Sequence, residues 1–241
     1  MIVRNSTNQI QTESNIEVID LFSIPLINGM IQEDTSDLES NIEFIPGSNQ
    51  NQEQWKIDRE KRNYRVLEKY PTTKKILLKY IRYSLKKLGY ASDFDLSTSW
   101  CTKSIKGDSA PLHSHKNSWF SAVYYYGDYD EDCGKFFMNN PLYNLTSFND
   151  KIVNVNNFNT PMTVIPPEKK KIIIFPSYVS HGVSTHYSNL TRYSLAFNIV
   201  PVGYYGNDND GAYDTSWYCG RVKKWLKTST LKHKWNLDKM F

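Results

Sequence analysis

Cysteine is scarce in this chain, and the few cysteines present follow no recognisable pattern. Three occur among 241 residues, at Cys101, Cys133 and Cys219. They form an odd set without the spacing of a zinc site. A disulfide framework is typical of small secreted domains, so we expect three free thiols in a reducing compartment.

Long apolar runs are also missing. No stretch approaches the roughly 18 to 20 apolar residues that span a bilayer. The first residues lack the positive start and continuous apolar core of a signal peptide. We therefore predict a soluble, cytoplasmic protein without a membrane partner. The sequons at Asn5, Asn144 and Asn189 would then carry no glycan, because N-glycosylation requires secretion.

A strong excess of charge of one sign is lacking as well. The chain has 29 Lys and Arg against 25 Asp and Glu, a formal net charge of +4. Its basic residues are spread along the sequence, so a nucleic-acid partner is not indicated. The sequence does not indicate an oligomeric state.

What the chain does contain is a series of short segments rich in Val, Ile, Thr, Tyr and Phe. They lie between about residues 95 and 202 and are separated by Gly, Pro and Asn. Such punctuation favours a β sandwich or barrel. We predict strands in DLSTSWCTKSI, SWFSAVYYYG, GKFFMNN, MTVIPP, KKIIIFPS and RYSLAFNIV.

Helical signals precede this region. After Pro71, apolar residues recur at helical spacing up to Leu88, with Lys and Arg on the opposite side, and Gly89 ends the pattern. We interpret this helix as packed on a sheet with a solvated basic face, rather than lying on a membrane. A polar helix is also predicted from Trp55 to Tyr70. It follows a short strand or extended segment in IEVIDLFSIPLI and an acidic, Asn-rich connection that runs to about Gln54.

The predicted organisation is a single domain over residues 1–241. Residues 1–91 form an N-terminal extension with supporting helices, and residues 92–202 form the β core. Residues 203–241 form a C-terminal extension, whose basic and aromatic end we expect to dock as a helix.

Two of the five histidines stand one residue apart in PLHSHKNSWF. If residues 112–116 are extended, His113 and His115 share a face, because strand side chains alternate with period two. His181 follows KKIIIFPSYVS, and strand ends distant in sequence meet at the mouth of a closed or sandwiched sheet. Three neutral imidazoles would form a facial set for a divalent transition metal. The alternative is that each is an ordinary surface or hydrogen-bonded histidine.

Arg192 predicts an anion site. It lies in RYSLAFNIV, whose apolar residues indicate burial, and a buried guanidinium requires an anionic partner. Ser194 shares its face and adds a hydroxyl. Arginine binds carboxylates in bidentate fashion, so a small acid held near the metal would account for both features.

In their order, the motifs HSH, FSAVYYYG, CGKFF, FPSYVSHGV and TRYSLAFNI resemble the core of the Fe(II)- and 2-oxoglutarate-dependent oxygenases, over about residues 96 to 200. The resemblance is strongest to the prolyl-hydroxylase-like branch and to a bacterial and phage group of such oxygenases. It implies a mainly β fold with flanking helices and a double-stranded β-helix core of the jelly-roll or cupin-like kind. It also implies Fe(II) as cofactor, 2-oxoglutarate and O2 as cosubstrates, and ascorbate in a supporting role. The implied activity is a dioxygenase that hydroxylates a C–H bond with release of succinate and CO2.

The resemblance also implies a metal-ligand set. His113 matches the first ligand and His181 the last, while His115 stands where the family usually has an aspartate. A neutral imidazole there leaves one negative charge fewer on the metal. An alternative register takes His115 as the first ligand and Asn117 as a weak oxygen ligand or leaves that position open; we prefer His113 and His115 together.

By the same resemblance, Arg192 would bind the distal carboxylate of 2-oxoglutarate, with Ser194 beside it. Tyr125 matches a tyrosine that the family often places near that carboxylate, and Ser121 is a candidate second contact on the same face. Tyr124 points to the other face and is predicted to belong to the core.

Two other functions remain open from the residues alone. A three-histidine site is also a catalytic zinc arrangement, which would make the protein a lyase or hydrolase. A β-barrel binding module without turnover is the other alternative. The substrate class expected from the resemblance is a small molecule, an amino acid or a peptidyl group. Aromatic residues expected either at the substrate entrance or in the core are Trp100, Trp119, Phe120 and Trp217, while His186 and His233 are expected to be structural or surface residues.

Overall fold

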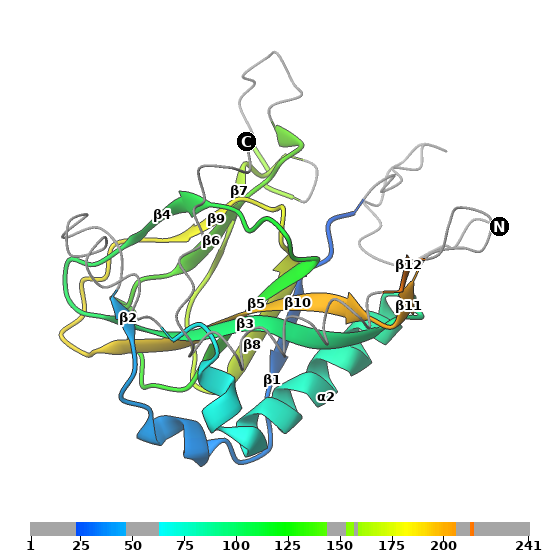
Figure 1. The fold of residues 1–241 in the computed structure, drawn as a ribbon. Helices are drawn as coiled ribbons and strands as arrows, with labels where there is room; N and C mark the ends of the chain where they lie inside the picture. Colours follow the sequence, from blue (N-terminus) through cyan, green and yellow to red (C-terminus); the bar gives the residue numbers. More distant parts are fainter. Residues whose placement is uncertain (1–22, 47–62, 144–152, 157–158, 206–212, 215–241) are drawn as a thin grey trace, which may run out of the picture.

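Two β-sheets face each other in the computed structural model, which describes residues 23–46, 63–143, 153–156, 159–205 and 213–214 (Figure 1). The larger sheet has the strand order β1-β8-β5-β10-β3-β2 and the smaller one β4-β9-β6-β7. Neighbouring strands are antiparallel except β2 and β3. The predicted mainly β fold is confirmed, and the two facing sheets form the jelly-roll core.

The larger sheet is built from β1 (Ile27–Met30), β2 (Ile45–Pro46), β3 (Asp93–Ser104), β5 (Phe120–Tyr125), β8 (Lys171–Pro176) and β10 (Arg192–Val202). The smaller sheet is built from β4 (Ala110–His113), β6 (Phe136–Asn139), β7 (Met162–Ile165) and β9 (His181–Val183). The remaining elements are η1 (Ser36–Ser40), η3 (Val66–Lys69), α2 (Pro71–Lys87) and the paired β11 (Tyr204–Tyr205) and β12 (Tyr213–Asp214).

The six strands predicted from composition are all present. In β10, buried and half-buried residues alternate over most of the strand, because one face lines the space between the sheets. Every residue of β8 is buried. This strand lies between β1 and β5 and is covered on both faces, which explains its unbroken apolar run.

The basic amphipathic helix is confirmed as α2, which begins at Pro71. It lies on the face of the larger sheet that points away from the smaller sheet (Figure 1), and it buries Thr73, Leu77, Ile81 and Leu85. Gly89 has φ +88°, the left-handed conformation that ends helices readily when glycine occupies it. Among the described residues, no helix combines the length and apolarity needed to cross a membrane.

The prediction of a polar helix from Trp55 to Tyr70 is wrong for residues 63–70, the part of this segment that the structure describes. Residues 63–70 form a parallel bridge from Arg65 to Ser99, followed by the short 3-10 helix η3. Ser99 donates its N–H to the carbonyl of Tyr64 and accepts the N–H of Leu67 on its hydroxyl. The carbonyl of Tyr64 and the N–H of Leu67 are therefore bonded to β3, whereas in an α-helix they would be bonded within the helix. Residues 55–62 and the C-terminal segment with Trp217, Cys219 and His233 lie outside the described residues.

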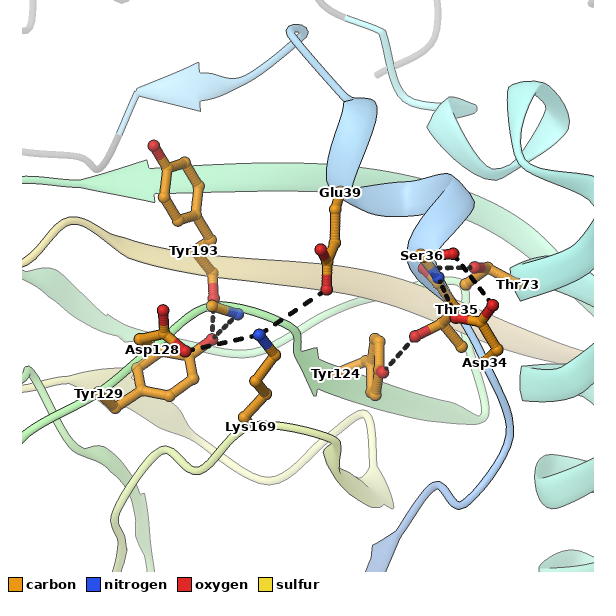
Figure 2. Close-up of polar contacts among 11 residues, drawn as sticks. Asp34, Thr35, Ser36, Glu39, Thr73, Tyr124, Asp128, Tyr129, Lys169 and Tyr193 are labelled. Atoms are coloured by element: carbon orange, nitrogen blue, oxygen red, sulfur yellow. Dashed lines mark hydrogen bonds and ion pairs between the residues drawn. The ribbon is translucent and has the colours of Figure 1, made fainter.

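The connection predicted to run to about Gln54 contains η1 and β2, and β1 begins at Ile27, where the predicted extended segment ends. β1 and β2 form the two edges of the larger sheet. Figure 2 shows how η1 is held. The hydroxyls of Thr35 and Tyr124 lie 2.7 Å apart, and Thr73 donates to the carbonyl of Thr35 at 3.4 Å. Lys169 Nζ lies 3.8 Å from Glu39 Oε1.

As predicted, Tyr124 belongs to the core on the outer side of β5. Cys101 and Cys133 are buried free thiols.

Gly182 in β9 is required by a close approach of the chain. A Cβ atom there would lie 2.7 Å from Phe137 Cζ and 2.8 Å from the carbonyl oxygen of Ala110. We expect Gly182→Ala to lower the free energy of unfolding by about 1–3 kcal/mol, because the backbone must shift. Chemical denaturation measures this. Gly29→Ala is the matched control, since its Cβ would meet only Ile172 Cγ2 at 3.8 Å; equal losses in both variants would contradict the steric explanation.

Candidate active site

Three histidines meet between the two sheets. His113 ends β4 and His181 begins β9, and the two residues are direct partners in the antiparallel register. His115 follows two residues after β4. Each histidine offers one ring nitrogen, and these three nitrogens all lie within 4.8 Å of one another. This spacing suits three ligands of a single ion.

The path of the chain that brings His115 into the cluster differs from the predicted one. The strand ends at His113, so residues 112–116 are not extended throughout, and Asn117 has φ +62°. The N–H of His115 donates to the carbonyl of Ser177, just after β8, at 3.0 Å. The histidines therefore converge through a cross-strand pair and a loop held to β8, rather than through one face of a single strand.

Hydrogen bonds at Nδ1 orient all three imidazoles. His113 and His181 each have Nδ1 at 2.8 Å from the backbone carbonyl two residues earlier. His115 has Nδ1 at 2.6 Å from the side-chain oxygen of Asn198. An imidazole that donates from Nδ1 has its lone pair on Nε2. The cluster therefore presents three Nε2 atoms, with the kind of outer hydrogen bonds that metal-ligating histidines make.

Burial favours the neutral form of His115 and His181. It lowers the pKa of His115, and it lowers the pKa of His181 to about 3. Both rings are therefore neutral at pH 7. The neutral ring is the form that binds a metal, so the residues fit a divalent transition ion.

Arg192 lies almost fully buried, with 2% of its surface exposed. Its Nε donates to the carbonyl of Gly134 at 2.9 Å, Nη1 to the hydroxyl of Ser194 at 3.2 Å, and Nη2 to the hydroxyl of Tyr125 at 3.4 Å. Within the described ranges, no carboxylate forms an ion pair with it. A buried guanidinium without a protein counter-charge is a candidate anion site.

Tyr125 is suited to the same site. Burial raises the pKa of its hydroxyl, although Arg192 acts in the opposite direction. The hydroxyl therefore stays protonated at neutral pH. Because it accepts a bond from Arg192, its own O–H remains available to donate to an anion.

One cavity of about 300 Å³ joins the histidine cluster to Arg192. The register explains this, since alternate residues of β10 face the cavity side and are matched by alternate residues of β3. The cavity is lined from β10 by Arg192, Ser194 and Ala196, and from β3 by Trp100, Thr102 and Ser104. The histidine end and the guanidinium end are thus parts of one pocket.

Ser121 has other partners than predicted. Its hydroxyl lies 3.0 Å from His115 Nδ1, donates to Asn198 Oδ1 at 2.9 Å and lies 2.8 Å from the hydroxyl of Ser177. Tyr125, four residues further along β5, contacts Arg192 instead. Four residues of a strand span roughly 13 Å, so the Ser121 hydroxyl lies at the histidine end of the cavity, and its contact with the carboxylate stays a prediction.

Sequence reasoning missed Asn198, Tyr64, Thr102 and Ser104. Three of them could have been found from the sequence. Asn198 lies an even number of residues from Arg192, and Thr102 and Ser104 lie an even number from Trp100, so each shares a strand face with that residue. Tyr64 had no such signal, because it precedes η3 and reaches the cavity only through the tertiary fold. Its ring centroid lies 6.1 Å from that of Trp100, which in turn lies 5.7 Å from His115.

The other singled-out residues have structural environments. His186 is buried, and its ring bonds the N–H of Gly134 and the carbonyl of Leu190. Phe120 lies in the core and Trp119 is 40% exposed. Within the part of the chain that the structure describes, His113, His115 and His181 form the one candidate metal-ligating group.

The fold and the site define a class: a jelly roll in which a candidate three-histidine metal centre and an anion site share one cavity. Residues 98–198 match the model of the family described as "Putative 2OG-Fe(II) oxygenase". These residues carry the sequence pattern of Fe(II)- and 2-oxoglutarate-dependent oxygenases, so the resemblance indicated by the motifs is confirmed. The family implies Fe(II), 2-oxoglutarate and O2 as cofactor and cosubstrates.

Three solved structures are similar to parts of this chain. An oxidoreductase of the 2OG-Fe(II) oxygenase family from Burkholderia pseudomallei is 17% identical, over 49% of this chain and 50% of that one, with a TM-score of 0.39. HygX from Streptomyces hygroscopicus with nickel and 2-oxoglutarate bound is 10% identical over 74% and 82%, with a TM-score of 0.44. A prolyl-4-hydroxylase from Pseudomonas putida is 19% identical over 44% and 51%, with a TM-score of 0.30. The chain thus spans about half the length of the first and third. No curated protein matches its sequence.

Proposed function

We propose that the protein is a 2-oxoglutarate-dependent dioxygenase that hydroxylates a C–H bond and releases succinate and CO2. One observation carries the proposal. A buried guanidinium without an acidic partner among the described residues lines the same cavity of about 300 Å³ as three imidazoles. The first feature suits a dicarboxylic acid and the second suits the metal beside it.

His113, His115 and His181 would hold Fe(II) through Nε2. Three neutral ligands carry one negative charge fewer than two histidines and a carboxylate, so the protein compensates less of the metal charge. When bound, iron together with 2-oxoglutarate supplies the oxidising chemistry by coupling decarboxylation to the use of O2. The chain's own contribution is to place the three ligands and to keep the buried rings of His115 and His181 neutral.

Arg192, Ser194 and Tyr125 would bind the distal carboxylate of 2-oxoglutarate. The guanidinium offers charge-assisted bonds to both carboxylate oxygens, and the protonated Tyr125 hydroxyl donates another. Burial of these groups excludes water, which strengthens each bond. The acid is thereby oriented with its other end toward the histidines.

The substrate would be a small molecule, an amino acid or a peptidyl group that places one C–H bond near the metal. The cavity volume is at the lower end of the range for ligand pockets, about 300 to 1,000 Å³. Cosubstrate and reacting group therefore fill it, and the rest of the substrate stays outside. Tyr64 and Trp100 form the aromatic wall beside His115.

A turnover assay tests this function. Metal-free protein reconstituted with Fe(II), ascorbate and 2-oxoglutarate is expected to form succinate in air and none without O2. A true substrate should raise the rate and gain one oxygen atom by mass spectrometry. Zinc-loaded protein is the control, since zinc has no redox chemistry.

Two outcomes would contradict the proposal. Stoichiometric zinc in the purified protein, with lyase or hydrolase activity and no succinate, would favour the three-histidine zinc enzyme. Tight 2-oxoglutarate binding without any succinate, over a panel of candidate substrates, would favour a binding module without turnover.

A further inference from the structure

We propose that Asn198 is a positioning residue of the metal centre, whose side-chain carbonyl holds His115 in the tautomer that presents Nε2 to the ion. The inference rests on the proposed metal site and extends it to a residue outside the ligand set. Asn198 would act through His115 and would not contact the metal.

The amide of Asn198 is oriented by contacts at both of its ends. Its Nδ2 donates to the hydroxyl of Thr98 at 3.0 Å, so Oδ1 faces His115 Nδ1 at 2.6 Å. Thr98 is the direct partner of Asn198 in the register of β3 and β10. The strand pairing therefore aims the carbonyl oxygen at the imidazole.

A chain of hydroxyls adds to this orientation. Ser121 donates to the same Oδ1 at 2.9 Å, and its hydroxyl lies 2.8 Å from that of Ser177. Both serines are buried, at 1% and 0% exposed. Since a carbonyl oxygen accepts two hydrogen bonds, the oxygen of Asn198 is satisfied by His115 and Ser121 together. A flipped amide would instead place its NH2 group against the Ser121 proton and His115 N–H.

His115 depends on a side chain in a way that the other two histidines do not. The Nδ1 atoms of His113 and His181 lie against backbone carbonyls, which no side-chain substitution removes. At His115 the closest acceptor is Asn198 Oδ1. Without that acceptor, the Ser121 hydroxyl 3.0 Å away still faces Nδ1, but it can donate as well as accept and so no longer fixes the proton there. A ring protonated at Nε2 has no lone pair there for a metal.

The nature of the acceptor also sets the charge around the metal. A neutral amide leaves His115 a neutral ligand, whereas a carboxylate acceptor raises the basicity of a ligating histidine. Asn198→Asp would therefore return a negative charge to the outer side of the ligand that stands at the family's aspartate position. Asn198→Leu keeps a similar size but has no acceptor.

Metal titration of the full-length apo protein tests the proposal, with Co(II) as the probe. Calorimetry gives its affinity, and its visible absorption reports the ligand geometry. We expect Asn198→Leu to bind Co(II) roughly 10- to 100-fold more weakly with an altered spectrum, and Asn198→Asp to bind at least as tightly as the unsubstituted protein. Asn140→Leu is the matched control, because Asn140 bonds the carbonyl of Thr160 and the N–H of Leu142 away from the cavity. It should leave affinity and spectrum unchanged.

A second measurement needs no folded variant at Asn198. Long-range 1H–15N NMR spectra of the unsubstituted apo protein report the tautomer of each histidine, with His115 assigned from His115→Gln. The expected result is a proton on Nδ1 of His115. A proton on Nε2 would overturn the proposal, as would an Asn198→Leu variant that binds Co(II) like the unsubstituted protein. Failure of the unsubstituted protein to bind Co(II) would instead overturn the metal site itself, and this inference with it.

Discussion

Arg192→Ala is expected to abolish succinate formation while the protein keeps its metal. The guanidinium is buried and has no acidic partner among the described residues, so a bound carboxylate would be its counter-charge. Removing one side of a buried charge-assisted pair costs about 2–5 kcal/mol, which corresponds to a fall in 2-oxoglutarate affinity of about 30- to 4,000-fold. Calorimetry of 2-oxoglutarate binding to the Co(II)-loaded protein measures this loss, and metal analysis measures what is retained.

Two further variants make the result specific. Arg82→Ala removes a half-buried arginine that pairs with Asp93 at 2.8 Å and does not line the cavity, and it should leave 2-oxoglutarate affinity unchanged. Ser194→Ala removes one neutral donor and should weaken binding only several-fold, since such a bond contributes about 0.5–1.5 kcal/mol. Unchanged 2-oxoglutarate affinity in folded Arg192→Ala would place the cosubstrate elsewhere.

His181→Ala is expected to release the metal and, with it, all turnover. His181 is the direct cross-strand partner of His113, and 4% of its surface is exposed. Loss of a ligand should weaken binding by more than the roughly 10- to 100-fold that loss of an outer hydrogen bond costs. Co(II) titration monitored by calorimetry and absorption measures the change, and circular dichroism checks that the fold is retained.

The control for this variant is another buried histidine. His186→Gln removes a ring that bonds Gly134 and Leu190 and lies outside the cavity. It should lower stability and leave Co(II) affinity within a few-fold of the unsubstituted protein. Full Co(II) affinity in His181→Ala would remove His181 from the ligand set and favour a site built on other residues.

Much of the β core follows from local patterns. Alternation in RYSLAFNIV predicted that Arg192 and Ser194 share a face, and the structure joins them by a hydrogen bond. The unbroken apolar run of KKIIIFPS became the fully buried β8. Helical spacing after Pro71 became α2. In β10 and α2 the side-chain period reports the face that is buried, whereas the unbroken run of β8 reports burial on both faces.

The features that local patterns did not predict share one cause. The polar segment before α2 pairs with β3 instead of forming an α-helix, because Ser99 supplies partners for Tyr64 and Leu67. Ser121 was expected at the carboxylate because it shares a face with Tyr125. Its actual partners, Asn198 and Ser177, lie on other strands or at their ends. Hydrogen bonds between distant segments decided these positions, and no local pattern encodes them.

The amino-acid sequence is enough to indicate which residues could carry the chemistry: an isolated histidine pair, a later third histidine and an arginine in an apolar strand. The sequence also indicates where the main strands and the long helix lie, because the side-chain period and the turn residues are local signals that extend over only a few residues. Only the tertiary structure decided that these groups line one cavity, and that Asn198 orients His115. Asn198 bonds Thr98 and Ser121, 100 and 77 residues away along the chain. Such pairings depend on strand register, which is set when the two sheets pack.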